Sequence, residues 1–259
     1  QIDGVDCEWL IPAGCDDAPV IYYLHGGAYI MGSPQTHRRV VSFIAKAAGM
    51  RALLPDYRLA PEHRYPAQLE DSLRVWRALV KGGLGPSSVA IAGDSAGGNL
   101  SVATMLSLRD AGEPLPAACF LLSPWLDLVG DGESHRSRSD HDPWFEPERM
   151  PTVVANFCDR ETAADPMVSS VRADASGLPP TLIQVGDHEI LLSDSTRFAD
   201  NIKAAGGRVD LHIWPEMWHV FQYFVGQMPE SSKAIDDIAR FLRSEFSTDR
   251  KDPAAERAA

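Results

Sequence analysis

Short motifs along this 259-residue chain carry side chains that could act together in nucleophilic chemistry. Residues 93–97 read GDSAG, which fits the pattern G-x-S-x-G, between a β-prone apolar run and a run of small and apolar residues. A serine on a sharp strand-to-helix turn presents its hydroxyl, and small neighbours keep it free of clashes. The pattern therefore predicts that Ser95 is a nucleophile at a helix N-terminus, which favours developing negative charge.

A second motif, His-Gly-Gly-Ala at residues 25–28, directly follows the first apolar run. Glycines let backbone N–H groups approach a substrate oxygen closely, and such a loop can surround an oxyanion together with the N–H that follows the nucleophile. We expect the amides of Gly27, Ala28 and Ala96 to donate, and Gly26 to shape the turn.

A general base and an acid are needed to activate a serine hydroxyl. Of the eight histidines, His219 is the one that lies just after the last predicted strand, so it fits as the base. Asp187 and Glu189 both follow the preceding predicted strand, and either carboxylate could orient the imidazole. Sequence spacing alone does not choose between them, and the competing His188 lies at the acid's position.

The elements that would position these residues alternate between strand-like and helix-like runs. Strands are expected at 20–24, 51–54, 89–92, 119–122, 181–185 and 209–213, and helices at 38–48, 69–80, 97–109, 193–205 and 231–246. This alternation predicts one α/β domain over residues 1–259, with a mostly parallel central sheet flanked by helices. Reactive groups should gather at the carboxyl ends of its strands.

Two polar stretches interrupt or follow the alternation. Residues of about 129–177 form a long polar insertion with one helix-like piece near 148–158, and we expect it to be a cap or lid over the site. Residues 248–259 are polar, and we expect them to be frayed.

The composition of the chain disfavours several classes of binding partner. The formal net charge of −12 disfavours binding to nucleic acid or to anionic lipid. No apolar run approaches the roughly 18 residues of a membrane span, and no signal peptide is visible. The four cysteines have no metal-like spacing, which favours free thiols, no metal site and a cytoplasmic location.

Taken together, these motifs resemble the bacterial hormone-sensitive lipase family of esterases, which has the α/β-hydrolase fold. The matching segments are 25–28 (HGGA), 56–62 (DYRLAPE), 93–99 (GDSAGGN), 123–125 (SPW), 177–180 (GLPP) and His219. The resemblance implies a serine carboxylesterase for short- to medium-chain esters, acting through an acyl-enzyme without a cofactor, with a small-molecule ester as substrate and a possible homodimer. The family's acid is followed by one variable residue and Leu, which favours Glu189 over Asp187.

The chain departs from the family pattern at two places. Ala28 replaces the third glycine of the usual HGGG, which keeps a backbone donor but adds a methyl group that could crowd bulky substrates. The family's N-terminal cap helices are apparently absent, so a partial cap is expected. We expect residues 56–62 to form a turn held by Arg58 and Glu62 behind the oxyanion loop. The alternatives to an esterase are a non-catalytic small-molecule receptor on this fold and an amidase.

Overall fold

The computed structural model describes residues 1–247, and the polar end predicted at 248–259 lies outside the described residues. Within them the chain forms a seven-stranded sheet with the order β1-β3-β2-β4-β5-β6-β7. The strands are β1 (Cys7–Leu10), β2 (Val20–Leu24), β3 (Arg51–Pro55), β4 (Val89–Asp94), β5 (Ala118–Leu122), β6 (Thr181–Gly186) and β7 (Val209–Trp214). The six predicted strands are confirmed within one or two residues, and the mostly parallel α/β-hydrolase sheet is confirmed with them.

Strand β1 was not predicted, and it is the one antiparallel member of the sheet. It pairs with β3 at the sheet edge, with Cys7 opposite Pro55 and Leu10 opposite Ala52. All the other pairings are parallel. The carboxyl ends of β4, β5, β6 and β7 therefore lie side by side at one edge of the sheet.

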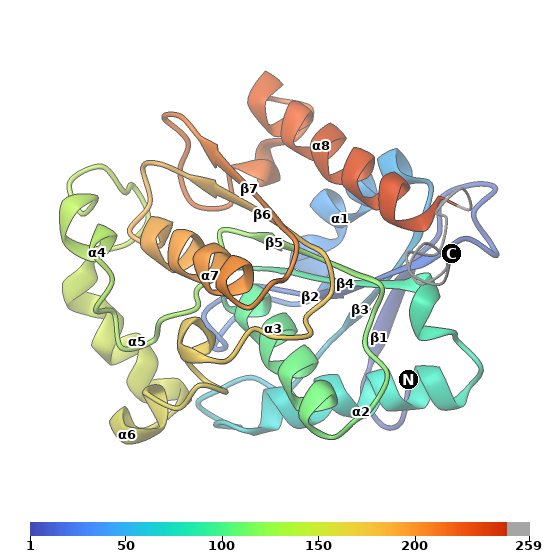
Figure 1. Cartoon of the computed structure of the whole chain (residues 1–259), viewed down its shortest axis with the longest axis horizontal. Coiled ribbons are helices and arrows are strands. Elements are labelled where there is room, and N and C mark those ends of the chain that lie inside the picture. The colour runs from blue at the N-terminus through green and yellow to red at the C-terminus, as the bar shows by residue number, and fades with distance from the viewer. Residues whose placement is uncertain (248–259) are drawn as a thin grey trace.

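Helices cover both faces of the sheet (Figure 1). The helices are α1 (Pro34–Ala48), α2 (Ala67–Lys81), α3 (Ser95–Asp110), α4 (Ser134–Ser137), α5 (Met150–Phe157), α6 (Arg160–Ala163), α7 (Leu192–Ala204) and α8 (Pro229–Phe246). Short 3₁₀ turns lie at η1 (Pro86–Ser88), η2 (Pro147–Arg149), η3 (Ser170–Arg172) and η4 (Phe221–Phe224). Helices α1 and α8 pack together on one face, and α2, α3 and α7 cover the other.

Helix α1 shows how local sequence sets these boundaries. The Ser33 hydroxyl accepts a hydrogen bond from the N–H of Thr36, while the Thr36 hydroxyl accepts one from the N–H of Ser33, which forms a capping box. Pro34 occupies the first turn, where its missing N–H costs nothing. Gly49 ends the helix in the left-handed conformation, at φ 70°.

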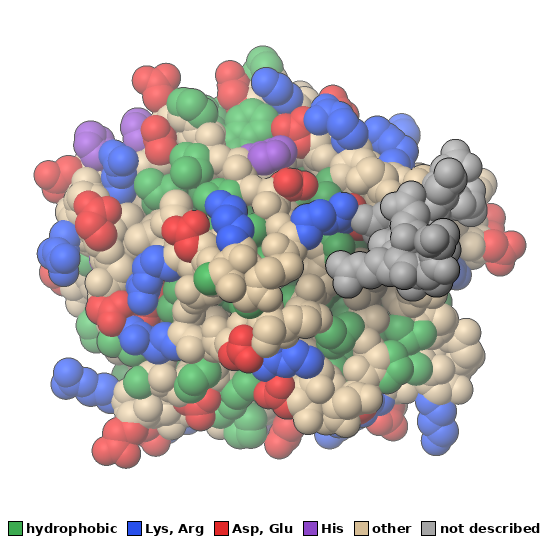
Figure 2. Space-filling view, in the orientation of Figure 1, with side chains coloured by type: hydrophobic (Ala, Val, Ile, Leu, Met, Phe, Trp, Pro, Cys, Tyr) green, Lys and Arg blue, Asp and Glu red, His purple; other side chains and the backbone are tan. Residues whose placement is uncertain are grey.

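The core has one layer on each face of the sheet. Neighbouring residues of β2 show the alternation: Tyr22 lies with Trp76 in the layer under α2 and α3, and Tyr23 lies with Ile44 in the layer under α1 and α8. Acidic and basic side chains intermingle over the face drawn in Figure 2. Among residues 1–247, no helix is both long enough and apolar enough to cross a bilayer.

Candidate active site

The GDSAG motif forms a tight turn between β4 and α3. Ser95 is the first residue of α3 and has a positive φ of 53°, which a non-glycine residue adopts only at a strained position. A Cβ on Gly97 would collide with the carbonyl oxygen of Leu24, and one on Gly93 would collide with the backbone of Gly97. Only glycine allows β2, β4 and α3 to approach this closely, so the predicted strand-to-helix turn is present.

Ser95 lies at a nearly enclosed point, with 6% of its surface exposed. Its carbonyl oxygen accepts a hydrogen bond from the N–H of Trp125, 3.0 Å away, which joins the turn to the end of β5. Its Oγ has no hydrogen-bond partner among the described residues. The Ser95–His219 hydrogen bond that the predicted chemistry needs is therefore not formed in this structure. Such bonds are often long in unliganded enzymes and tighten when substrate binds.

The His-Gly-Gly-Ala loop leaves β2 with donors available. The N–H of Gly26 donates to Oδ1 of Asp94 at 3.0 Å, as befits a residue that shapes the turn. Within residues 1–247, the N–H groups of Gly27 and Ala28 have no hydrogen-bond acceptor. The N–H of Ala96 lies in the first turn of α3, where no intrahelical acceptor exists. These amides come from the two segments where the sequence predicted an oxyanion hole.

The conformation of the loop is unusual. Gly27 has φ 117°, and the next two residues, Ala28 and Tyr29, have φ 55° and 64°. A Cβ on Gly27 would collide with the backbone carbonyl of Met31, so this position requires glycine. The Tyr29 ring is stacked on Phe157 at the end of α5, with 3.9 Å between the ring centroids.

Residues 56–62 support this loop from behind, as expected, but the contacts differ from the predicted ones. The Tyr57 hydroxyl donates to the His25 carbonyl at 2.5 Å, and the Tyr57 ring is stacked on the His25 imidazole. The predicted turn held by Arg58 and Glu62 is wrong. Arg58 instead pairs with Asp71 and Glu70 on α2, at 2.8 and 3.0 Å.

The structure brings Glu189, and not Asp187, to His219. Nδ1 of His219 is 3.0 Å from Oε2 of Glu189, whose side chain is fully buried. Oε1 of Glu189 accepts hydrogen bonds from the Ser123 hydroxyl at 2.7 Å and from the Gly186 N–H at 2.6 Å. Oδ1 of Asp187 instead accepts from the N–H of Glu216. Three hydrogen bonds thus fix the Glu189 carboxylate beside His219, whereas the Asp187 carboxylate holds the turn at Glu216.

The loop that carries His219 is packed against the end of β6. A Cβ on Gly186 would collide with the carbonyl of Met217, and the same carbonyl accepts from the N–H of His188 at 3.0 Å. Beyond His219, the N–H of Val220 donates to the Ser123 hydroxyl at 3.1 Å. Ser123 therefore bonds both the acid and the histidine loop.

A phenylalanine from the long insertion contacts the histidine. Phe145 meets the His219 ring edge to face, with 4.6 Å between the centroids and 66° between the ring planes. Asp142 holds this piece of chain, because its Oδ1 accepts from the N–H of Phe145 and its Oδ2 from the N–H of Ile190. The insertion is thus bonded to the residue that follows Glu189, and sequence reasoning had not named Phe145.

The insertion carries α4, α5 and α6, which Figure 1 shows along the left side of the molecule. The predicted helix near 148–158 is present as α5. A hollow of about 610 Å³ lies between these helices and the chain that follows β5. Its lining is mainly apolar and includes Trp125, Leu128, Met150, Val154 and Ala163, with Arg136 and Arg160 among its charged members.

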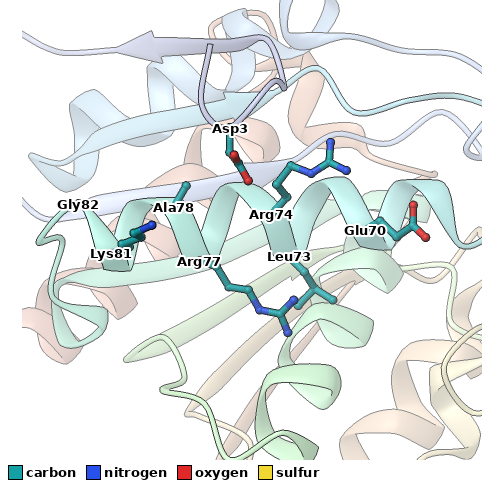
Figure 3. A pocket seen from close by; sticks show the side chains of 8 residues that line it. All are labelled: Asp3, Glu70, Leu73, Arg74, Arg77, Ala78, Lys81 and Gly82. Atoms are coloured by element: carbon teal, nitrogen blue, oxygen red, sulfur yellow. The ribbon is translucent and has the colours of Figure 1, made fainter.

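Another hollow, of about 960 Å³, lies over the outer surface of α2 (Figure 3). Its lining includes Asp3, Leu73, Arg74 and Arg77 and none of the predicted site residues. Arg77 forms an ion pair with Glu113 at 2.6 Å. This surface hollow is separate from the cluster around Ser95.

Comparisons with known proteins agree with this geometry. Residues 21–223 match a protein family that is described as having the α/β-hydrolase fold. The chain is 40% identical over 237 residues to an acetyl-hydrolase of Streptomyces hygroscopicus, covering 92% of this chain and 79% of that protein. It is 38% identical over 235 residues to an esterase of Acinetobacter venetianus, covering 90% and 78%.

Solved structures of esterases are also similar to this chain. An esterase from the bacterial hormone-sensitive lipase family superposes with a TM-score of 0.92 at 45% identity, covering 95% of this chain and 83% of that one. The esterase EstE5, in a crystal soaked with p-nitrophenyl butyrate, superposes with a TM-score of 0.91 at 40% identity and the same coverage.

Proposed function

Because this chain belongs to the bacterial hormone-sensitive lipase family of α/β-hydrolase-fold serine ester hydrolases, we propose that it cleaves short- to medium-chain carboxylic esters through Ser95, His219 and Glu189. The observation that carries the assignment of the acid is the 3.0 Å contact between Nδ1 of His219 and Oε2 of Glu189. That contact leaves Nε2 of the same imidazole to take the serine proton.

The reaction then proceeds in two halves. Ser95 Oγ attacks the ester carbonyl as His219 accepts its proton, and the imidazolium next protonates the departing alcohol. The carboxylate of Glu189 stabilises the imidazolium and fixes which ring nitrogen carries the hydrogen. Water attacks the acyl-enzyme with the same histidine as base, and the acid product leaves.

Negative charge develops on the carbonyl oxygen in both halves. We assign its stabilisation to the N–H groups of Gly27, Ala28 and Ala96, with Gly26 holding the loop in place. Support comes from the unused N–H groups of Gly27 and Ala28 and from the helix N-terminus at Ala96. Each such donor is typically worth about 2.7–4 kcal/mol of transition-state stabilisation.

The acyl group is assigned to the apolar hollow beside Trp125, and residues 129–177 act as a lid over it. Two observations support this. Trp125, which lines the hollow, donates its N–H to the Ser95 carbonyl, so one wall of the hollow is hydrogen-bonded to the residue that carries the proposed nucleophile. Phe145 packs on His219, so the same insertion shields the base from water.

The direct test is a series of p-nitrophenyl esters from acetate to dodecanoate, assayed with the wild-type enzyme and with Ser95→Ala. Release of p-nitrophenol should be fastest for short and medium acyl chains and absent for the variant. Binding of the ester without release would instead indicate a receptor. Faster cleavage of the matching anilides than of the esters would indicate an amidase.

A further inference from the structure

A fully enclosed carboxylate lies directly before the nucleophile, and the proposed reaction gives it no role. Asp94 is 2% exposed and accepts hydrogen bonds at both oxygens. Its Oδ1 accepts from the Tyr23 hydroxyl at 2.9 Å and from the Gly26 N–H at 3.0 Å, and its Oδ2 accepts from the Tyr223 hydroxyl at 2.9 Å. Nε2 of His37 is 3.5 Å from the same Oδ2.

These partners come from separate parts of the chain. Gly26 belongs to the oxyanion loop, and Tyr223 lies in η4, the turn that follows His219. Tyr23 lies in β2, and His37 lies in α1. Asp94 itself precedes Ser95, so a single side chain contacts the segments that carry every part of the proposed machinery except the acid.

The carboxylate of Asp94 favours the protonated form of His37. Nδ1 of His37 is 3.0 Å from the Ser33 carbonyl oxygen, to which it donates when it is protonated, and 2.8 Å from the Thr36 hydroxyl, which can donate to it when it is not. A favourable contact of Nε2 with the Asp94 carboxylate requires a hydrogen on Nε2. Burial lowers the pKa of His37, but the charge of Asp94 outweighs burial and the pKa is raised. Burial raises the pKa of Asp94, and the His37 charge and the hydrogen bonds bring it down to about 2.

The contact with the oxyanion loop is close as well as bonded. A Cβ on Gly26 would collide with the Asp94 carboxylate, so loop and side chain are in direct van der Waals contact. The histidine loop is tied down from the same side by α1, because Arg39 donates to the carbonyls of Tyr223 and Val225 at 2.9 and 2.7 Å. Displacement of the carboxylate would move both loops relative to Ser95.

We propose that Asp94, held by His37, is a positioning residue that keeps the oxyanion loop and the His219 loop in one arrangement around Ser95. The inference rests on the proposed function, because it concerns the geometry of that same site. A purely structural network would affect stability alone. A positioning network also affects the chemical step, because a displacement of about 1 Å in a catalytic group can cost on the order of a hundredfold in rate.

Tyr223→Phe removes one hydrogen bond to Asp94, and Tyr22→Phe is the matched control. The Tyr22 hydroxyl is also buried and donates to the Ser72 carbonyl at 2.9 Å, but it faces the opposite layer of the core. Both variants should lose a similar amount of thermal stability. Tyr223→Phe should lower kcat by roughly tenfold at nearly constant KM, while Tyr22→Phe leaves kcat within about twofold of wild type.

A trifluoromethyl ketone provides a second readout, because Ser95 would add to it to form an oxyanion that needs the same loop. Its affinity should weaken in Tyr223→Phe in parallel with kcat, and the affinity of the carboxylate product should not change. His37→Gln, which keeps a neutral donor near Asp94, should show the same pattern and serves if Tyr223→Phe does not fold.

Equal kcat and equal ketone affinity in wild type, Tyr223→Phe and His37→Gln would overturn the positioning role. A wild-type enzyme that turns over no ester would instead overturn the proposed function, so the two failures are distinguishable.

Discussion

Glu189 holds His219 with a carboxylate that has no freedom to turn. Oε2 faces Nδ1 of the imidazole at 3.0 Å, while Oε1 is held by the Ser123 hydroxyl and the Gly186 N–H. Asp187 lies two residues away and points to the N–H of Glu216. The two acidic side chains of one loop therefore have different partners and, we predict, different roles.

Exchanging each carboxylate for its amide tests this difference. Glu189→Gln should lower kcat by about 10⁴, because an amide neither fixes the correct tautomer nor stabilises the imidazolium. Asp187→Asn keeps an oxygen acceptor for the Glu216 N–H and should leave kcat close to the wild-type value. Steady-state kinetics on p-nitrophenyl butyrate measure both, and a larger loss in Asp187→Asn would assign the acid to that residue.

Replacement of Ser95, the proposed nucleophile, should nearly abolish turnover. Ser95→Ala should reduce kcat by on the order of 10⁶ if the three residues act as a unit. Ser107→Ala, on the same helix but far along it, is the matched control and should retain full activity. A residual rate in Ser95→Ala within about tenfold of wild type would remove this serine from the mechanism.

Ala28 occupies a left-handed conformation that glycine would adopt without strain. Ala28→Gly should therefore raise the free energy of unfolding by about 1 kcal/mol or less, since glycine's extra freedom in the unfolded chain offsets part of the gain. Loss of the methyl group should also raise kcat/KM for a branched ester such as p-nitrophenyl pivalate relative to the acetate. Urea denaturation and these two substrates provide the measurements. A loss of stability together with an unchanged substrate ratio would contradict both expectations.

The hollow beside Trp125 gives a prediction about acyl length. Met150 is partly exposed and lines it, so Met150→Trp should fill the space and shift the preferred p-nitrophenyl ester toward shorter chains. Met150→Ala should shift it toward longer chains. If both variants keep the wild-type profile of kcat/KM against chain length, the acyl group binds elsewhere.

A fall in pH should lower the free energy of unfolding, because Asp94 becomes protonated. Its pKa is about 2 in the folded chain against an ordinary value of 3.8, so its stabilising contribution is complete above pH 3.8 and is lost as the pH falls toward 2. The difference in pKa corresponds to about 2 kcal/mol. The pKa of His37 is raised, so its own contribution is complete below about pH 6.5 and is lost as the pH rises through the raised value.

Denaturation of wild type and Asp94→Asn at several pH values measures this contribution. The gap in unfolding free energy between the two proteins should be widest between about pH 4 and 6.5, where both charges are present, and should narrow below pH 3. A gap that stays constant from pH 6 to pH 2.5 would show that the Asp94 charge does not stabilise the fold.

Local patterns predicted most of the fold and part of the site. Buried parallel strands read as continuous apolar runs, which marks most of the six predicted strands, and all six are present. The edge strand β7 instead alternates apolar residues with Asp210 and His212. Strand β1 was missed because its four residues, including Glu8 and a partly exposed Trp9, lie at the sheet edge and show no such run. The predicted partner of Arg58 was wrong because its actual partners, Glu70 and Asp71, lie on α2, outside the 56–62 motif from which the prediction was made.

The site residues that sequence spacing could not identify are determined by contacts between distant parts of the chain. Asp187 and Glu189 differ by two residues, and only the packing of the His219 loop on Gly186 decides which of them it meets. His37 gave no signal, because a histidine on a helix is ordinary until Asp94, 57 positions later, lies beside it. Phe145 was hidden in a polar insertion without periodicity.

The two glycines that flank Ser95, one in β4 and one in α3, determine which parts of this enzyme tolerate substitution. Gly93 and Gly97 bring three backbone segments so close that any added side chain would push Ser95 out of place. Random mutagenesis of residues 89–100 should therefore give mainly dead clones, whereas libraries confined to the lining of the hollow at Leu128, Met150 and Ala163 leave that junction intact. New substrate ranges should be sought in the latter.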